Sequence, residues 1–77
     1  MRFEIVWHPL AVHQLENLGW HPAESVDAAV IRFAETQRGD VERVPPYYRL
    51  RVGVYRVRFT IDHETRTMNV LSVYRVR

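Results

Sequence analysis

The sequence predicts an α+β domain in which two helices cover one face of a small, mostly antiparallel twisted sheet. Helical periodicity is confined to the first half of the chain, roughly residues 9–38, and the second half alternates apolar and polar side chains as half-buried strands do. The expected order is strand, helix, helix and then three antiparallel strands. Helices segregated from a run of strands are typical of the α+β class. Residues 1–77 are expected to form a single domain.

The first predicted element is a strand at Arg2–Trp7, in which alternate residues are apolar: Phe3, Ile5 and Trp7. His8-Pro9 then begins a short helix, because the missing N–H of proline costs nothing at the first helical position. Gly19 is expected to end this helix. Its apolar stripe consists of Ala11, Leu15 and Leu18.

The second predicted helix begins at Trp20-His21-Pro22 by the same chemistry and ends at Gly39. Its apolar residues recur with helical spacing, so they are expected to form one stripe that packs on the sheet. This stripe consists of Val26, Ala29, Val30, Phe33 and Ala34, whereas Ile31 lies off it.

A hairpin is predicted over Tyr47–Phe59, after an extended linker at Asp40–Pro46. Gly53-Val54 suits a two-residue type II′ turn, whose first central position favours glycine. A final strand is expected at roughly Arg66–Arg75, after a turn at residues 63–65. The helices should cover the sheet face that carries the alternate apolar side chains of these strands. These side chains are Leu50, Val52, Tyr55, Val57, Phe59 and Ile61.

Closing the hairpin places four arginines on its other face, which is expected to be open and concave. Arg51 should lie opposite Arg56, and Arg49 opposite Arg58. Like charges directly opposite each other destabilise a sheet, so this cluster indicates an anion site, and a phosphate backbone suits it. The competing interpretation is a solvated face whose charge is partly neutralised by carboxylates such as Glu42 and Asp62.

Four tyrosines are interleaved with the arginines, a pattern that suits single-stranded nucleic acid because bases stack on rings. Tyr48 and Tyr55 fall on the apolar parity and are expected in the core. Tyr47 and Tyr74 are the surface candidates for RNA binding.

Composition excludes several other classes. All eleven basic residues are arginine, the net charge is +2, and there is no cysteine, so neither a disulfide nor a cysteine metal site is possible. The four histidines show no metal-ligand spacing, so no metal and no cofactor are expected. No apolar run approaches the roughly 20 residues of a membrane span, and a cytoplasmic protein is expected.

The residues so far described resemble the RelE/ParE superfamily of bacterial toxins. Trp7-His8-Pro9-Leu10-Ala11 is similar to the end of the family's first strand. The stretch from Tyr48 to Phe59, read as YRLRVGVYRVRF, is similar to the family's YRLRVGDYRVIY pattern. Ile61-Asp62 and Val70-Leu71-Ser72-Val73 continue the resemblance over nearly the whole chain.

In the ribonuclease branch of this superfamily, the toxin enters the ribosomal A site and cuts mRNA without a metal. The ribose 2′-hydroxyl attacks the adjacent phosphate and leaves a cyclic phosphate. The resemblance implies that Arg49, Arg51 and Arg56 bind and polarise the phosphates, with Arg58 and Arg75 assisting. Strict alternation, however, places Arg75 on the face opposite to the other arginines.

The chain departs from the family near Val73-Tyr74-Arg75-Val76-Arg77, where a Val-Gly-His-Arg-like run and a tail tyrosine are usual. Arginine stays protonated, so proton transfer lacks an obvious residue, and Tyr47, Tyr74 and His63 are the candidates. Three readings therefore remain open: a ribosome-dependent mRNA endoribonuclease, a ParE-like inhibitor of DNA gyrase, and a degenerate relative that binds only RNA or an antitoxin.

The resemblance also implies partners. A small acidic antitoxin, with a disordered segment that folds across the toxin, is expected beside the ribosome and mRNA. An exposed sheet edge would also permit a homodimer or a toxin–antitoxin hetero-oligomer.

Overall fold

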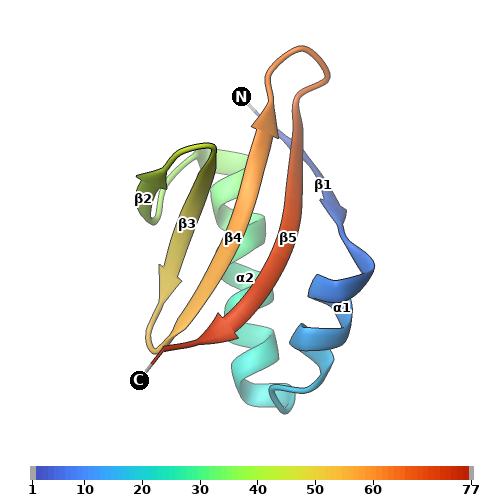
Figure 1. Ribbon diagram of the computed structural model, residues 1–77, viewed down its shortest axis with the longest axis vertical. Helices are drawn as coiled ribbons and strands as arrows, with labels where there is room; N and C mark the ends of the chain where they lie inside the picture. The colour runs from blue at the N-terminus through green and yellow to red at the C-terminus, as the bar shows by residue number, and fades with distance from the viewer. Residues whose placement is uncertain (1, 77) are drawn as a thin grey trace.

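A computed structural model describes residues 2–76 as two layers, a five-stranded sheet and a pair of helices behind it (Figure 1). The α+β class and the segregation of helices from strands are as predicted. The elements are β1 (Glu4–Trp7), α1 (Pro9–Glu16), α2 (Trp20–Thr36), β2 (Asp40–Val44), β3 (Tyr47–Val52), β4 (Tyr55–Asp62) and β5 (Thr67–Arg75).

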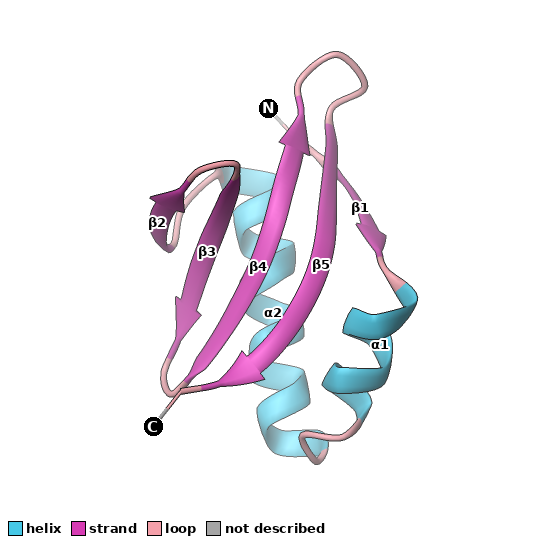
Figure 2. Cartoon of the chain, in the orientation of Figure 1, coloured by secondary structure: helices cyan, strands magenta, loops and turns pink. Residues whose placement is uncertain are grey.

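The sheet has the strand order β1-β5-β4-β3-β2. The pairs β2–β3, β3–β4 and β4–β5 are antiparallel, and only β1 runs parallel to its neighbour β5. Figure 2 shows the strands in front, with α2 crossing behind them and α1 beside β5. One sheet face is therefore covered by helices and the other is open.

The helices begin and end through local chemistry. Pro9 occupies the start of α1, and the side chain of His8 accepts a hydrogen bond from the backbone N–H of Leu10 (3.2 Å). α2 begins at Trp20, directly after Gly19. Pro22 is therefore the third residue of its helix, whereas Pro9 is the first residue of α1. It ends at Gln37, which adopts a left-handed conformation (φ 57°) and closes the helix two residues before Gly39. The predicted stop at Gly39 was therefore slightly late.

The core lies between α2 and the sheet. Val26, Val30 and Ala34 of α2 are buried, as the helical periodicity predicted. From the strands, the predicted residues Leu50, Val57 and Phe59 are buried, and three further residues of β5 join them: Met68, Val70 and Val73. Val52, Tyr55 and Ile61 are partly buried at the edge of this core, and Ile31 is exposed as expected.

The predicted linker at Asp40–Pro46 is wrong, because Asp40–Val44 forms the edge strand β2. It pairs antiparallel with β3 from Asp40 opposite Arg51 to Val44 opposite Tyr47. A cis Pro45-Pro46 peptide joins the two strands. The sheet consequently has four strands after the helices where three were expected.

The hairpin between β3 and β4 has the predicted register and turn. Gly53 has φ of 59°, whereas Val54 keeps a negative φ, which is the pattern of a type II′ turn. A side chain at Gly53 would meet no atom within 4 Å, so the glycine is favoured there by its backbone alone.

A bulge in β5 decides which face its last residues occupy. Arg58 pairs with Ser72, but the next residue, Phe59, pairs with Val70, so β5 carries one extra residue at this point. Pairing with β1 ends at the same position, where His8 N–H donates to the carbonyl of Val70 (2.8 Å). Beyond Val70, β5 no longer pairs with β1 and contacts α1 instead.

Gln14 of α1 makes one of these contacts. Its side-chain oxygen accepts the backbone N–H of Val73 at 2.7 Å, so a buried strand donor is satisfied by a helix side chain. The helix thereby holds the far half of β5 in place.

Within residues 2–76, no helix is long and apolar enough to cross a membrane.

Candidate functional site

The open side of the sheet carries the predicted cluster of arginines. Arg49 lies opposite Arg58 and Arg51 opposite Arg56 across the β3–β4 pair. We call these four side chains, Arg49, Arg51, Arg56 and Arg58, the arginine face. Their strand neighbours Leu50 and Val57 point into the core, because successive side chains alternate between the two faces of a sheet.

Two carboxylates from β2 pair with one side of the arginine face. The register sets Asp40 opposite Arg51 and Glu42 opposite Arg49. Asp40 Oδ1 accepts Arg51 Nε at 3.2 Å. Glu42 Oε1 accepts both the Nε (3.0 Å) and the Nη2 of Arg49.

Glu42 and Arg49 each stabilise the charged form of the other. The hydrogen bond and the positive charge of Arg49 lower the pKa of Glu42 below its ordinary value, and the charges of Arg51 and Arg56 add to this effect. Conversely, the hydrogen bond to Glu42, followed by an interaction with the Tyr74 hydroxyl, raises the pKa of Arg49. Arg49 is thus a fixed cation held between Glu42 and Tyr74.

Among residues 2–76, no carboxylate pairs with the β4 side of the face. Nη1 of Arg56 donates to the carbonyls of Gly53 (2.8 Å) and Tyr55 (2.9 Å), so it is tied to the hairpin turn. The guanidinium of Arg58 lies over the ring of Tyr47, 4.8 Å from its centroid. In the described part of the chain neither arginine forms an ion pair, so positive charge is concentrated on β4.

Both surface tyrosines lie where the sequence predicted. Tyr47 shares the parity of Arg49 on β3, and Tyr74 of β5 pairs with Arg56. Together with two of the arginines they line a pocket of about 300 Å³, whose wall is Val44, Pro45, Tyr47, Tyr48, Arg49, Arg58 and Tyr74. Tyr48 lies on the core side, stacked on Phe59 (ring centroids 5.5 Å apart).

Three other candidates are not part of this site. Arg75 pairs with Tyr55 and is exposed on the helix side of the sheet, on the same face as Val73, as strict alternation predicted. Its predicted role in RNA binding is therefore not supported by its position. His63 lies in the β4–β5 turn against the ring of Phe3 (centroids 6.2 Å apart), and not over the arginines.

Asp62, which the sequence suggested as a counter-charge, caps the same turn. Its Oδ1 accepts the backbone N–H groups of Glu64 (3.0 Å) and Thr65 (3.3 Å). The neutralising carboxylates are Glu42, as considered, and Asp40, which sequence reasoning missed together with its strand.

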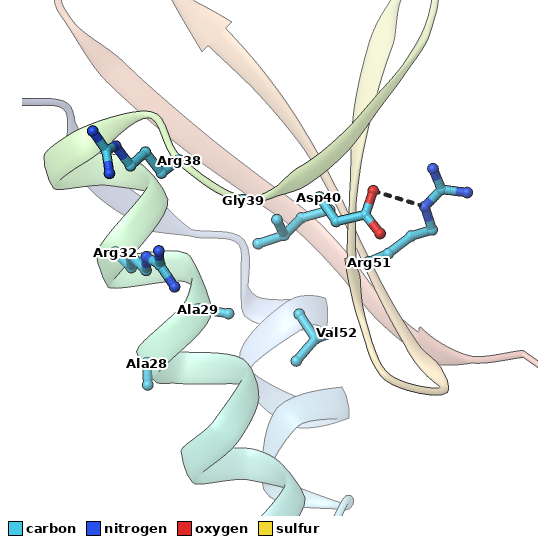
Figure 3. A pocket seen from close by; sticks show the side chains of 9 residues that line it. Ala28, Ala29, Arg32, Arg38, Gly39, Asp40, Arg51 and Val52 are labelled. Atoms are coloured by element: carbon cyan, nitrogen blue, oxygen red, sulfur yellow. Dashed lines mark hydrogen bonds and ion pairs between the residues drawn. The ribbon is translucent and has the colours of Figure 1, made fainter.

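A second hollow lies on the helix side, between α2 and β3 (Figure 3). It has a volume of about 360 Å³, and Ala28, Ala29, Leu50 and Val52 are its apolar residues. Arg32 and Arg38 reach it from the α2 side, and the Asp40–Arg51 pair lies on the strand side, as the dashed contact shows. This groove adjoins the arginine face at Arg51 but does not open onto the tyrosines.

The chemistry available at the arginine face is anion binding and charge stabilisation. Guanidinium groups present planar, paired donors that match phosphate oxygens. No group of three histidine, cysteine or acidic residues that could hold a metal occurs within residues 2–76. Of the three proton-transfer candidates, Tyr47 and Tyr74 lie at the arginine face, whereas His63 lies against Phe3.

Solved structures of similar shape place the chain in a known fold. An archaeal RelE–RelB complex from Pyrococcus horikoshii matches with a TM-score of 0.84 at 18% identity, over 97% of this chain and 96% of that one. The isolated RelE toxin of E. coli matches with a TM-score of 0.80 at 18% identity, over 100% of this chain and 86% of that one. This is the RelE toxin fold.

A structure whose sequence is more similar to this chain has the same fold. The RelBE2 toxin–antitoxin complex of Mycobacterium tuberculosis matches at 24% identity with a TM-score of 0.72, over 97% of this chain and 99% of that one. No protein-family model and no curated protein matches the sequence. The predicted RelE-like fold is therefore confirmed by structure, at identities too low to carry an activity across.

Proposed function

We propose that this protein is the toxin of a toxin–antitoxin pair and acts as a RelE-like, ribosome-dependent mRNA endoribonuclease. The observation that carries the proposal is the arginine face, in which Arg56 and Arg58 form no ion pair with any described residue and Arg49 and Arg51 stand opposite them. The RelE fold of the neighbouring toxins supports it.

In the proposed reaction, the ribose 2′-oxygen attacks the adjacent phosphorus and the bond to the 5′-oxygen of the next nucleotide breaks. The products are a 2′,3′-cyclic phosphate and a 5′-hydroxyl. Negative charge grows on the phosphate oxygens in the transition state, and fixed cations stabilise that charge without reorganising. Arg49, Arg51 and Arg56 are assigned this role, and no metal is required.

Proton transfer is a separate task, because arginine stays protonated. Tyr74 is the best placed candidate, since its hydroxyl interacts with Arg49. His63 lies against Phe3 in the β4–β5 turn, away from the arginine face, so we do not assign proton transfer to it.

We propose an acidic antitoxin as the partner that silences this surface. Four of the solved structures with a similar fold are complexes of a RelE protein with RelB, which supports a partner of that kind. A segment rich in Asp and Glu would compete with RNA for Arg56 and Arg58. A cytoplasmic location follows from action on the ribosome.

The test is mRNA integrity in a reconstituted translation reaction, mapped by primer extension. Wild type is compared with Arg56→Ala and with Arg32→Ala, an equal change of charge at an exposed site on α2. Cuts that need the ribosome, made by wild type and Arg32→Ala but at least 100-fold slower by Arg56→Ala, would support the proposal. The expected loss follows the roughly 10²–10³-fold cost of removing one transition-state donor.

Intact mRNA from folded wild type would contradict the nuclease proposal. The next measurement would then be supercoiling by DNA gyrase, the target in the ParE branch. Circular dichroism of each variant shows whether lost activity reflects lost folding.

A further inference from the structure

The arginine face has an aromatic ring at each end of its central pair. Arg49 and Arg58 lie opposite each other, and Ser72 follows them on β5. Tyr47 precedes Arg49 by two residues on β3, and Tyr74 follows Ser72 by two residues on β5. The two rings therefore stand on opposite sides of the arginine pair, along the diagonal of the sheet.

Both rings reach the same hollow as the arginines between them. The pocket of about 300 Å³ is lined by Tyr47, Arg49, Arg58 and Tyr74 together. Arg58 also lies over the Tyr47 ring, 4.8 Å from its centroid, and holds that ring in place. A ligand that stacks on this ring therefore meets little cost of ordering it.

The order ring, cation, ring matches the order base, phosphate, base in a single strand. A bare anion would need only the arginines, and a duplex keeps its bases stacked inside. Single-stranded nucleic acids bind through such alternation of aromatic side chains and basic groups. Single-stranded RNA bases also stack on the planes of arginine guanidinium groups, and Arg58 presents such a plane.

We infer that the site binds a dinucleotide step of single-stranded RNA, with the phosphate on Arg49 and Arg58 and its two flanking bases on Tyr47 and Tyr74. This inference rests on the proposed function, since it names how the RNA of that reaction is held. It assigns the tyrosines to substrate binding, where the proposed reaction uses only the arginines for charge.

The test is an NMR titration of the free protein with two probes. The first is adenylyl-adenosine with a 2′-O-methyl group, which has one phosphate and two bases and cannot be cleaved. The second is inorganic pyrophosphate, which has no base. Ring protons of Tyr47 and Tyr74 report stacking, and the Nε–H groups of Arg49 and Arg58 report the phosphate.

The dinucleotide is expected to shift both the ring and the arginine signals, whereas pyrophosphate shifts the arginine signals with little change at the rings. Tyr47→Leu and Tyr74→Leu should each weaken dinucleotide binding roughly tenfold, within the range measured for loss of one base–ring stack. Their affinity for pyrophosphate should stay within about twofold of wild type.

Three further variants separate stacking from other effects. Tyr47→Phe and Tyr74→Phe keep the ring and should bind the dinucleotide as wild type does. Trp20→Leu removes an exposed aromatic ring, 69% accessible and outside the sheet, and should change nothing. If a leucine variant fails to fold, ring shifts in wild type and the phenylalanine variants still decide the question.

The inference is overturned if the dinucleotide shifts only the arginine signals, or if the leucine variants bind it normally; the phosphate site of the proposed function would survive that result. If neither probe shifts any of these signals, the phosphate site fails as well. Cleavage in the translation reaction, measured separately, decides the proposed activity independently.

Discussion

The strand β2 gives the most direct quantitative test of the arginine face. Its carboxylates Glu42 and Asp40 pair with Arg49 and Arg51, so a phosphate must compete with them for those two guanidinium groups. Arg56 and Arg58 have no such competitor among the described residues. Removing one carboxylate charge should therefore release one more arginine for RNA.

The expected magnitude follows from counterion release. For single strands, log K falls with log [salt] with a slope of about −0.7 per phosphate neutralised. Arg49 and Arg51 are already neutralised by carboxylates, so they add little to this slope even where a phosphate displaces those carboxylates. Arg56 and Arg58 alone give a slope of about −1.4 for wild type, and Glu42→Gln should give about −2.1. Adding Asp40→Asn should give about −2.8. Between 50 and 200 mM KCl, affinity should fall about 7-fold, 18-fold and 50-fold respectively.

The assay is fluorescence anisotropy of a labelled single-stranded RNA at four KCl concentrations. Glu64→Gln is the control, because it removes the same charge in the exposed β4–β5 turn. An identical slope for Glu42→Gln and Glu64→Gln would refute the reasoning, since charge removal would then act at long range only. So would a wild-type slope near −2.8, which would mean that the carboxylates do not compete.

Three further predictions concern stability and are read from urea unfolding. Phe59→Ala should cost about 3–5 kcal/mol because this fully buried ring packs on α2 and β3, whereas exposed Ile31→Ala should stay within about 0.5 kcal/mol; equal midpoints would contradict the assigned core. Gly53→Ala should cost about 1–2 kcal/mol through its positive φ alone, and Gly53→Asn less, since asparagine visits this region; the reverse order would rule out a type II′ turn. Because Arg49 lowers the pKa of Glu42 in the folded state, the stability from this pair is present above the unfolded pKa and is lost as pH falls below about 4.5. Unfolding midpoints at pH 7, 5 and 3 should therefore fall more for wild type than for Glu42→Gln, and parallel curves would contradict the pairing.

Most of the fold could be predicted because its signals are local. Helical periodicity located Val26, Val30 and Ala34 in the core, and Gly53 with its alternating flanks fixed the hairpin register. That register alone placed the four arginines on one face, and it placed Tyr47 with them. Local patterns decide these features because each is set within one helix or one hairpin.

β2 was missed because it lacks the local signal of a strand. Asp40–Val44 is a charged edge strand followed by two prolines, and edge strands need no apolar face. A nonlocal signal was present in the sequence: Asp40 and Glu42 alternate as Arg49 and Arg51 do, with opposite charge. Opposite charges directly across a strand pair stabilise it, so this alternation could have revealed the pairing.

The bulge in β5 is the other feature beyond local reasoning. It keeps both Val70 and Val73 in the core by adding one residue between them, a choice made by the neighbouring strands and not by the local pattern. Position also settled two doubtful candidates, since Arg75 and His63 both lie away from the site.

The position of β5 has a consequence for when the protein can act. Among the described strands it comes last in sequence order, yet it lies in the sheet between β4 and β1, the first of them. Pairing of such distant segments is slow, because the loop between them must close before any contact forms. Until then β1 has no partner strand and Tyr74 is not yet beside the arginines. Tyr74 therefore joins the arginine face only after this long-range pairing is complete, and before that the apolar stripe of α2 is open to a chaperone or a binding partner.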